Sequence, residues 1–230
     1  MIINKIDKDL PDFNVTDILS PFGPLMMKGS LKEPIRKKTL SDIKKILDND
    51  EPSDKVIHGA YGEGQDATIN AGKFKALDGN HSDIIQLIHN LCSEYYSCIC
   101  FNVAQERPEI WDKLEKSNKI ITSMWCVLMK EGDFHISHNH TMEGAMVSGG
   151  IYLDIPKHIK SPLGDINWNM SLPGIDFRSD IYKHSPKNGD WVIWPAWLQH
   201  HVYPFRGEGE RIMISFNARL DPKDDQDYDK

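Results

Sequence analysis

Hydrophobic residues in the first half of the chain recur at the spacing of amphipathic helices. In the segment LSDIKKILDND (residues 40–50), the apolar positions follow Ser41, which is a favourable N-terminal cap. The segment HSDIIQLIHNLCSEYY (81–96) repeats the pattern behind Ser82. We therefore expect two amphipathic helices, whose apolar faces are Ile43, Ile46 and Leu47 in the first and Ile85, Leu87, Ile88 and Leu91 in the second.

From about residue 119 the pattern changes to short apolar runs that are rich in Ile, Val, Trp and Tyr. Gly, Pro and Asp separate these runs, as is typical of strands joined by turns. The pattern predicts an all-β core with the spacing of a sandwich or a closed barrel. The predicted strands lie within residues 119–132, 146–156, 164–170, 189–195, 200–205 and 211–220.

These patterns predict one mainly β domain with flanking helices. We expect residues 1–118 to form a helical and connective region that packs on the outside of the core. Residues 119–220 would form the β core itself. The acidic segment 221–230 has almost nothing to bury and is expected to be a mobile tail.

The composition of the 230 residues is that of a globular protein, with a net charge of −7 and a pI near 5.8. An acidic chain argues against nucleic acid as a partner, and the short basic run Lys32 to Lys38 is interpreted as a solvated face. Four cysteines and the lack of a long apolar stretch favour free thiols, a cytoplasmic location and no membrane partner. A homodimer is an open alternative.

Three histidines in the second half are candidate metal ligands. On a strand, His138 and His140 point to the same side, so their imidazoles converge on one place. Neutral imidazole is a common ligand of iron, zinc, nickel and copper. A third ligand comes from either His200 or His201 at the start of a later strand, since neighbours on a strand face opposite ways.

The strand that begins at Arg211 suggests an acidic co-substrate. Its alternate residues share one face of the strand. If that face points inward, a buried guanidinium requires an anion, and its geometry suits a carboxylate. The alternative is an outward Arg211 that pairs with Glu208 or Glu210. The residues on the Arg211 face are Arg211, Met213, Ser215 and Asn217.

Residues 122–219 resemble the iron(II)/2-oxoglutarate oxygenases of the double-stranded β-helix superfamily. The resemblance rests on the order and spacing of several motifs: SMWCVLMKEGDFHISHNH, VSGGIYLDIP, GDWVIWPAWLQHHVYPF and ERIMISFN. It implies a double-stranded β-helix (jelly-roll) core packed by N-terminal helices. It further implies Fe(II) as cofactor, 2-oxoglutarate as co-substrate, and hydroxylation of a substrate C–H bond with decarboxylation of 2-oxoglutarate to succinate.

The resemblance also assigns roles to individual residues. His138 becomes the first metal ligand and His200 the distal one. The position two after the first histidine, usually Asp or Glu in the superfamily, is His140 in this chain. We expect the three histidines to bind the metal, although Asp133 or Glu143 could supply a carboxylate if a bulge reversed its direction. The residues expected to hold the far carboxylate of 2-oxoglutarate are Arg211, Ser215 and Tyr152.

Two other functions use the same residues. A cupin-like metalloenzyme would need no 2-oxoglutarate, and the spacing from Gly132 through Glu143 to Gly149 is one residue short of the cupin motif. The cupin interpretation also leaves Arg211 without a role. A non-catalytic binding protein on an oxygenase scaffold is the third alternative. The sequence does not identify the substrate, which is either a small molecule or a peptide or protein.

Overall fold

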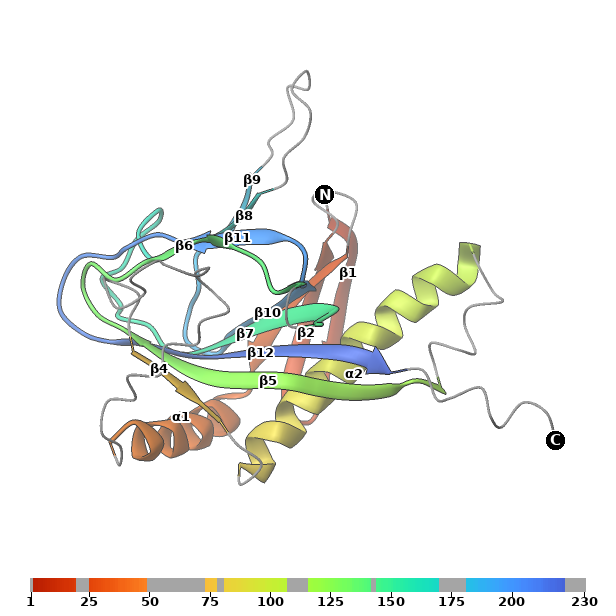
Figure 1. The fold of residues 1–230 in the computed structure, drawn as a ribbon, viewed down its shortest axis with the longest axis horizontal. Coiled ribbons are helices and arrows are strands. Elements are labelled where there is room, and N and C mark those ends of the chain that lie inside the picture. Colours follow the sequence, from red (N-terminus) through yellow and green to blue (C-terminus); the bar gives the residue numbers. More distant parts are fainter. Residues whose placement is uncertain are drawn as a thin grey trace, which may run out of the picture.

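The fold consists of a large sheet that has two helices on one side and a small sheet on the other (Figure 1). The computed structural model describes residues 2–19, 25–48, 73–77, 81–106, 116–141, 144–169 and 181–221. Within them, the prediction of a mainly β fold with flanking helices is confirmed.

The large sheet has eight strands in the order β1-β2-β3-β10-β7-β12-β5-β4, and all its pairs are antiparallel. Its longest pairing joins β5 to β12, which run side by side through the middle of Figure 1. The strands are β1 (Ile2–Asp9), β2 (Phe13–Leu19), β3 (Met26–Leu31), β4 (Lys73–Ala76), β5 (Asn118–Met129), β7 (Val147–Asp154), β10 (Asp190–Pro195) and β12 (Arg211–Asp221).

The small sheet has four antiparallel strands in the order β6-β11-β8-β9. It lies on the side of the large sheet away from α1 and α2 (Figure 1). Its strands are β6 (His135–His138), β8 (Ile166–Asn169), β9 (Ile181–His184) and β11 (Gln199–Val202). The central strands of the large sheet are thus covered on both faces.

Two cores result, and β12 contributes to both. Ile212, Ile214 and Phe216 pack toward the helices, while Met213 packs toward the small sheet. This alternation follows from the period of two in a β-strand, which sends successive side chains to opposite faces. A near-continuous apolar run is therefore the expected sequence of a strand that is buried on both sides.

The N-terminal region differs from the expected helical and connective segment. Residues 2–31 include β1, β2 and β3, which extend the large sheet beyond β10. On β2, Phe13 and Val15 are buried whereas Thr16 is exposed, as in a strand with one buried face. Charged residues between short apolar runs concealed this alternation. The predicted tail, from residue 222 onward, lies outside the described residues.

Both predicted helices are present and both are longer than their apolar segments. α1 spans Glu33–Asp48 and α2 spans Ser82–Glu106. The basic run that was interpreted as a solvated face forms the first turns of α1, where Lys37 and Lys38 are exposed but Arg36 is buried. The helical period places Arg36 on the same inward face as Ile43. Neither helix has an apolar stretch of the length that crossing a bilayer requires.

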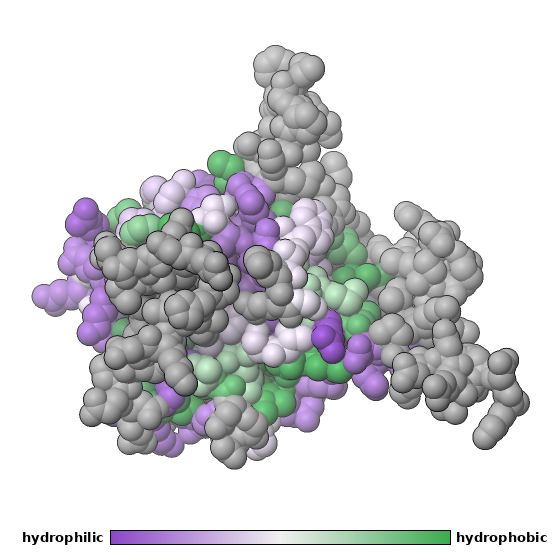
Figure 2. Space-filling model, in the orientation of Figure 1, coloured by the Kyte–Doolittle hydropathy of each residue, from purple (hydrophilic) through white to green (hydrophobic). Residues whose placement is uncertain are grey.

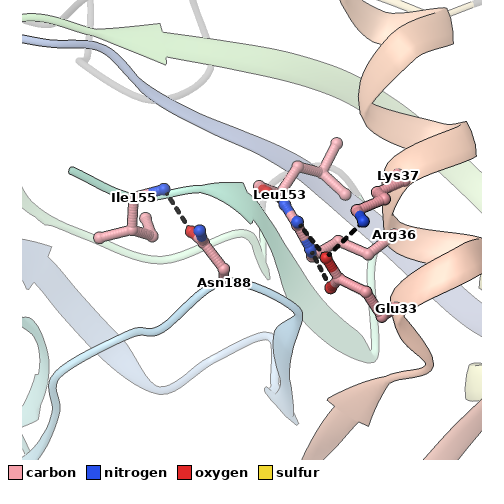
Figure 3. A network of polar contacts seen from close by, with 6 residues as sticks. All are labelled: Glu33, Arg36, Lys37, Leu153, Ile155 and Asn188. Atoms are coloured by element: carbon pink, nitrogen blue, oxygen red, sulfur yellow. Dashed lines mark hydrogen bonds and ion pairs between the residues drawn. The ribbon is translucent and has the colours of Figure 1, made fainter. Parts of the chain in front are cut away.

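Arg36 fastens the start of α1 to the large sheet (Figure 3). Its Nη1 donates a hydrogen bond of 2.6 Å to the carbonyl oxygen of Leu153 on β7. Its Nε and Nη2 donate to the two carboxylate oxygens of Glu33 at 2.8 and 2.7 Å. This contact with Arg36 lowers the pKa of Glu33 to about 2. The helix is thereby held beside the end of β7.

Gly149 on β7 leaves room for the side chain of Phe216 on the neighbouring strand β12. A Cβ at this position would lie 2.1 Å from Cζ of Phe216, well inside van der Waals contact. Gly150 faces the other way, and the nearest atom to a Cβ there would be the terminal methyl carbon of Met213, at 3.0 Å. The two adjacent glycines are therefore under different steric limits.

We predict that Gly149→Ala lowers the free energy of unfolding by about 1–3 kcal/mol, since the buried ring of Phe216 must shift to admit the methyl group. Gly150→Ala is the matched control and should lower it less, because the Met213 side chain can rotate. Chemical denaturation of the two variants measures the difference. Equal losses would show that the contact with Phe216 is not the limiting one.

Candidate metal centre

The structure brings together three histidines from two neighbouring segments. His138 ends β6 and stands directly opposite His200 on β11. His140 lies just beyond β6, and its backbone N–H donates to the carbonyl oxygen of Ala196 at 2.9 Å. One ring nitrogen from each of the three histidines lies within 4.8 Å of the others. Such a cluster can hold a single transition-metal ion.

Backbone hydrogen bonds fix the protonation of two of these rings. Nδ1 of His138 lies 2.7 Å from the carbonyl oxygen of Ile136, and Nδ1 of His200 lies 3.2 Å from that of Leu198. A carbonyl oxygen can only accept, so each Nδ1 carries the proton. Nε2 of each ring then keeps its lone pair, as a metal ligand requires.

Burial affects the protonation of His200. His140 and His200 are both buried, and His138 is half-buried. Burial, and then the neighbouring His138 and His140, lower the pKa of His200 well below its usual value. His200 is accordingly neutral at pH 7 and ready to bind a cation.

The other residues considered as metal ligands, His201, Asp133 and Glu143, are not part of the described histidine cluster. His201 is outside the cluster, and its ring packs against Tyr203 at 5.0 Å. Oδ2 of Asp133 accepts a hydrogen bond of 2.7 Å from the backbone N–H of Lys130, within a turn. Glu143, which we did not expect to be a ligand, lies outside the described residues. Among those described, the cluster consists of three histidines without a carboxylate.

An aromatic wall adjoins the histidines. The ring centre of Trp194 on β10 lies 5.0 Å from that of His200 and 5.2 Å from that of Trp168 on β8. Trp168 continues the wall to Tyr182 at 5.7 Å. From the sequence, such tryptophans could line a pocket, although aromatic residues in β-core strands are more often packing residues. The position of Trp168 opposite His200 depends on the pairing of β11 with β8, which no local motif reveals.

Arg211 is a buried cation. Charged groups normally lie in water, and hydrophilic residues accordingly cover much of the left end of the molecule in Figure 2. Arg211 departs from this rule. Arg211 is only 1% exposed, so the alternative of an outward side chain paired with Glu208 or Glu210 is wrong. Its Nη1 contacts Sδ of Met129 at 2.8 Å, whereas Nε and Nη2 have no hydrogen-bond partner among the described residues. Two donors of a buried charge are therefore available to an anion.

Tyr152 lies beside this cation. The guanidinium carbon of Arg211 is 5.3 Å from the centre of the Tyr152 ring, and no hydrogen bond to Oη of Tyr152 is found in the part of the chain that the structure describes. Burial raises the pKa of Tyr152 to about 12, so its hydroxyl is a neutral donor at pH 7. A Cβ at Gly150 would lie 3.6 Å from this oxygen, which shows that the glycine leaves space next to it.

Ser215 lies on the Arg211 face of β12, opposite Gly150 on β7 and Trp125 on β5. It is half-buried. Arg211, Tyr152 and Ser215 thus occur on two adjacent strands of the large sheet, and Tyr152 belongs to the core facing the small sheet. The donors of Arg211 and Tyr152 fit a carboxylate ligand, and the histidines fit a divalent metal.

Sequence comparison finds a family model that matches this part of the chain. Residues 123–217 match the family described as "Putative 2OG-Fe(II) oxygenase". This range includes all the residues placed in the site. The chain matches no curated protein sequence.

Solved structures show the same architecture at low sequence identity. The carbocyclase SnoK from nogalamycin biosynthesis, described as non-heme and alpha-ketoglutarate dependent, is 9% identical, with a TM-score of 0.54 over 85% of this chain and 79% of that one. The epimerase SnoN, solved with Fe3+, alpha-ketoglutarate and nogalamycin RO, is 13% identical, with a TM-score of 0.51 over 85% and 78%. These likenesses confirm the predicted double-stranded β-helix.

A third structure matches over a shorter range. The 2OG-Fe(II) oxygenase family oxidoreductase from Burkholderia pseudomallei is 15% identical, with a TM-score of 0.37 over 46% of this chain. The present chain spans about half of that protein, 48% of its length.

We predict that the double variant His138→Ala/His200→Ala loses at least about a hundredfold in zinc affinity, because two of the three clustered ligands are removed. The matched control, His135→Ala/His201→Ala, removes two histidines from the same strands that lie outside the cluster and should bind zinc within about threefold of the original chain. Isothermal titration measures both. Unchanged binding in the first variant would remove this cluster from consideration.

Proposed function

We propose that this member of the 2OG-Fe(II) oxygenase family binds Fe(II) through His138, His140 and His200 and binds 2-oxoglutarate with the help of Arg211. Its reaction is hydroxylation of a substrate C–H bond with decarboxylation of 2-oxoglutarate to succinate. The observation that carries the proposal is the combination of a three-histidine cluster with a buried, unpaired guanidinium on the opposite sheet.

The charges of the site favour a dianion. Three neutral imidazoles leave the full +2 charge of a bound ferrous ion uncompensated, and Arg211 adds another positive charge. Burial lowers the pKa of Arg211, which reflects the cost of a cation away from water. 2-Oxoglutarate carries two carboxylates, so one can meet the metal while the other meets the guanidinium.

The histidines determine how much of the metal stays accessible. Each would contribute one nitrogen to a bound ion, which would leave its remaining coordination positions for other groups. When bound, the ferrous ion and 2-oxoglutarate supply the oxidation: one atom of O2 enters succinate, the other enters the hydroxylated product, and CO2 leaves. The chain itself binds, orients and shields the reactants.

Arg211 and Tyr152 act on the far carboxylate of 2-oxoglutarate. The guanidinium can donate two parallel hydrogen bonds from Nε and Nη2, and Oη of Tyr152 can add a third. Ser215 is a further donor on the Arg211 face. Trp194 and Trp168 exclude water beside His200. The proposal specifies the type of reaction. The substrate is either a small molecule or a peptide or protein.

Turnover tests the proposal directly. Under argon, Fe(II) and 2-oxoglutarate together should give a visible charge-transfer band, and exposure to O2 should then yield succinate even without a substrate. His138→Ala/His200→Ala should give neither signal, because the ligands are missing. Metal binding by the original chain without a band would favour the cupin-like alternative. Absence of metal binding would leave a non-catalytic scaffold.

Arg211 provides the more specific test of 2-oxoglutarate binding. We predict that Arg211→Ala raises the dissociation constant of 2-oxoglutarate by about thirtyfold or more, which corresponds to a lost contact of about 2–4 kcal/mol. Arg211→Lys should recover only part of the affinity, because one ammonium group cannot reproduce the guanidinium fork. Titration of 2-oxoglutarate into the zinc-loaded chain measures both.

Arg219→Ala is the matched control on the same strand, since Arg219 is half-exposed and pairs with Asp221 at 3.7 Å. It should leave 2-oxoglutarate affinity within about twofold. Zinc affinity should be unchanged in all three variants. Equal 2-oxoglutarate binding by the original chain and Arg211→Ala would refute the co-substrate assignment even if the metal site were intact.

A further inference from the structure

A row of three polar side chains crosses the centre of the large sheet. Asn217 on β12 stands opposite Ser123 on β5 and opposite Ser148 on β7. Oγ of Ser148 donates to Oδ1 of Asn217 at 2.7 Å, and Nδ2 of Asn217 donates to Oγ of Ser123 at 3.1 Å. Asn217 is completely buried, and Ser148 is 1% exposed. Such a polar row in a core requires that its groups be hydrogen-bonded.

The row ends at His140. The side-chain amide nitrogen of Asn217 lies 3.4 Å from Nδ1 of His140. In His138 and His200, the corresponding Nδ1 faces a backbone carbonyl of its own segment, which can only accept. His140 therefore differs from the other two histidines, because the group at its Nδ1 can either donate or accept.

The orientation of the Asn217 amide determines which nitrogen of His140 carries the proton. With Nδ2 toward the ring, Nδ1 must accept, so the proton is on Nε2 and that atom cannot bind a metal. With Oδ1 toward the ring, Nδ1–H donates and Nε2 keeps its lone pair. Because each serine hydroxyl both donates and accepts, the row satisfies the amide in either orientation.

We propose that Asn217 is a positioning residue that sets the tautomer of His140, turning its carbonyl oxygen toward Nδ1 so that Nε2 binds the metal. This inference rests on the metal site of the proposed function. Ser148 and Ser123 hold the amide by hydrogen bonds from the two neighbouring strands. The buried row thus acts as an outer support for one ligand, as hydrogen-bonded partners of metal-binding histidines commonly do.

The first experiment uses the original chain with zinc as a diamagnetic probe. Proton–nitrogen correlation spectra of 15N-histidine-labelled protein distinguish protonated from metal-bound ring nitrogens, and His140→Ala identifies the signals. We expect zinc-bound His140 to carry a proton on Nδ1 and to bind through Nε2. Zinc bound through Nδ1, or a proton on Nε2, would overturn the proposal without requiring any variant of Asn217 to fold.

The second experiment compares substitutions that differ in hydrogen bonding. Asn217→Ala removes the acceptor and should weaken zinc binding by about tenfold to a hundredfold. Asn217→Asp places an acceptor there in every orientation and should bind zinc within about threefold of the original chain or more tightly. Asn167→Ala is the control, because Asn167 is also buried and donates to a backbone carbonyl, that of Asp165, at 3.2 Å.

Thermal unfolding of the zinc-free variants checks that each is folded, and Asn167→Ala should bind zinc within about threefold. Asn217→Ala that binds as tightly as the original chain, or Asn217→Asp that binds as weakly as Asn217→Ala, would contradict the role of Asn217 alone. Failure of the original chain to bind zinc would contradict the metal site as well.

Discussion

The strict alternation of side chains along β12 is the constraint on which the rest of the structure depends. A strand buried on both faces must place every second residue in each of two cores. Ile212, Ile214 and Phe216 meet the helices, so the remaining positions must face the small sheet. Arg211 and Asn217 are among those positions, and they are the polar groups that the proposed chemistry uses. The register of β12 consequently determines both which residues pack against the helices and which residues face the site.

The site contains buried polar groups at positions where apolar side chains would make the folded protein more stable. A buried guanidinium with two unpaired nitrogens destabilises the fold unless an anion reaches it. The same holds for the hydroxyl of Tyr152, which burial keeps neutral. A ligand that satisfies these groups stabilises the folded state as it binds, so occupancy and stability are linked.

Local patterns predicted the parts of the fold whose sequence expresses one dominant periodicity. The strands from β5 onward are rich in β-branched and aromatic residues, and the apolar faces of α1 and α2 follow a helical repeat. β4 and β9 have four residues each and exist because longer or neighbouring strands pair with them. The first turns of α1 escaped prediction because Lys37 and Lys38 resemble a surface loop until Arg36 is seen to be buried.

The sequence predicted which residues form the candidate site. It did not predict the tertiary contacts that position them. Strand parity alone could not choose between His200 and His201, whereas the pairing of β11 with β6 puts His200 opposite His138. The face of Asn217 followed from β12, but its neighbour His140 belongs to the segment beyond β6, so their contact depends on how two sheets close on each other. Such contacts are tertiary and leave no local signal.

The position of β6 at the edge of the small sheet has a consequence for how the metal would leave. This strand has four residues and a single neighbour, β11, and the pairing is irregular between His200 and Val202. Short edge strands open locally at far lower free energy than the whole protein unfolds. His138 ends this strand and His140 follows it, so fraying of β6 withdraws two of the three nitrogens in one step. If the three histidines bind the proposed ion, its exchange would depend on the opening of this edge strand, and the bound ion would in turn protect the amide hydrogens of β6.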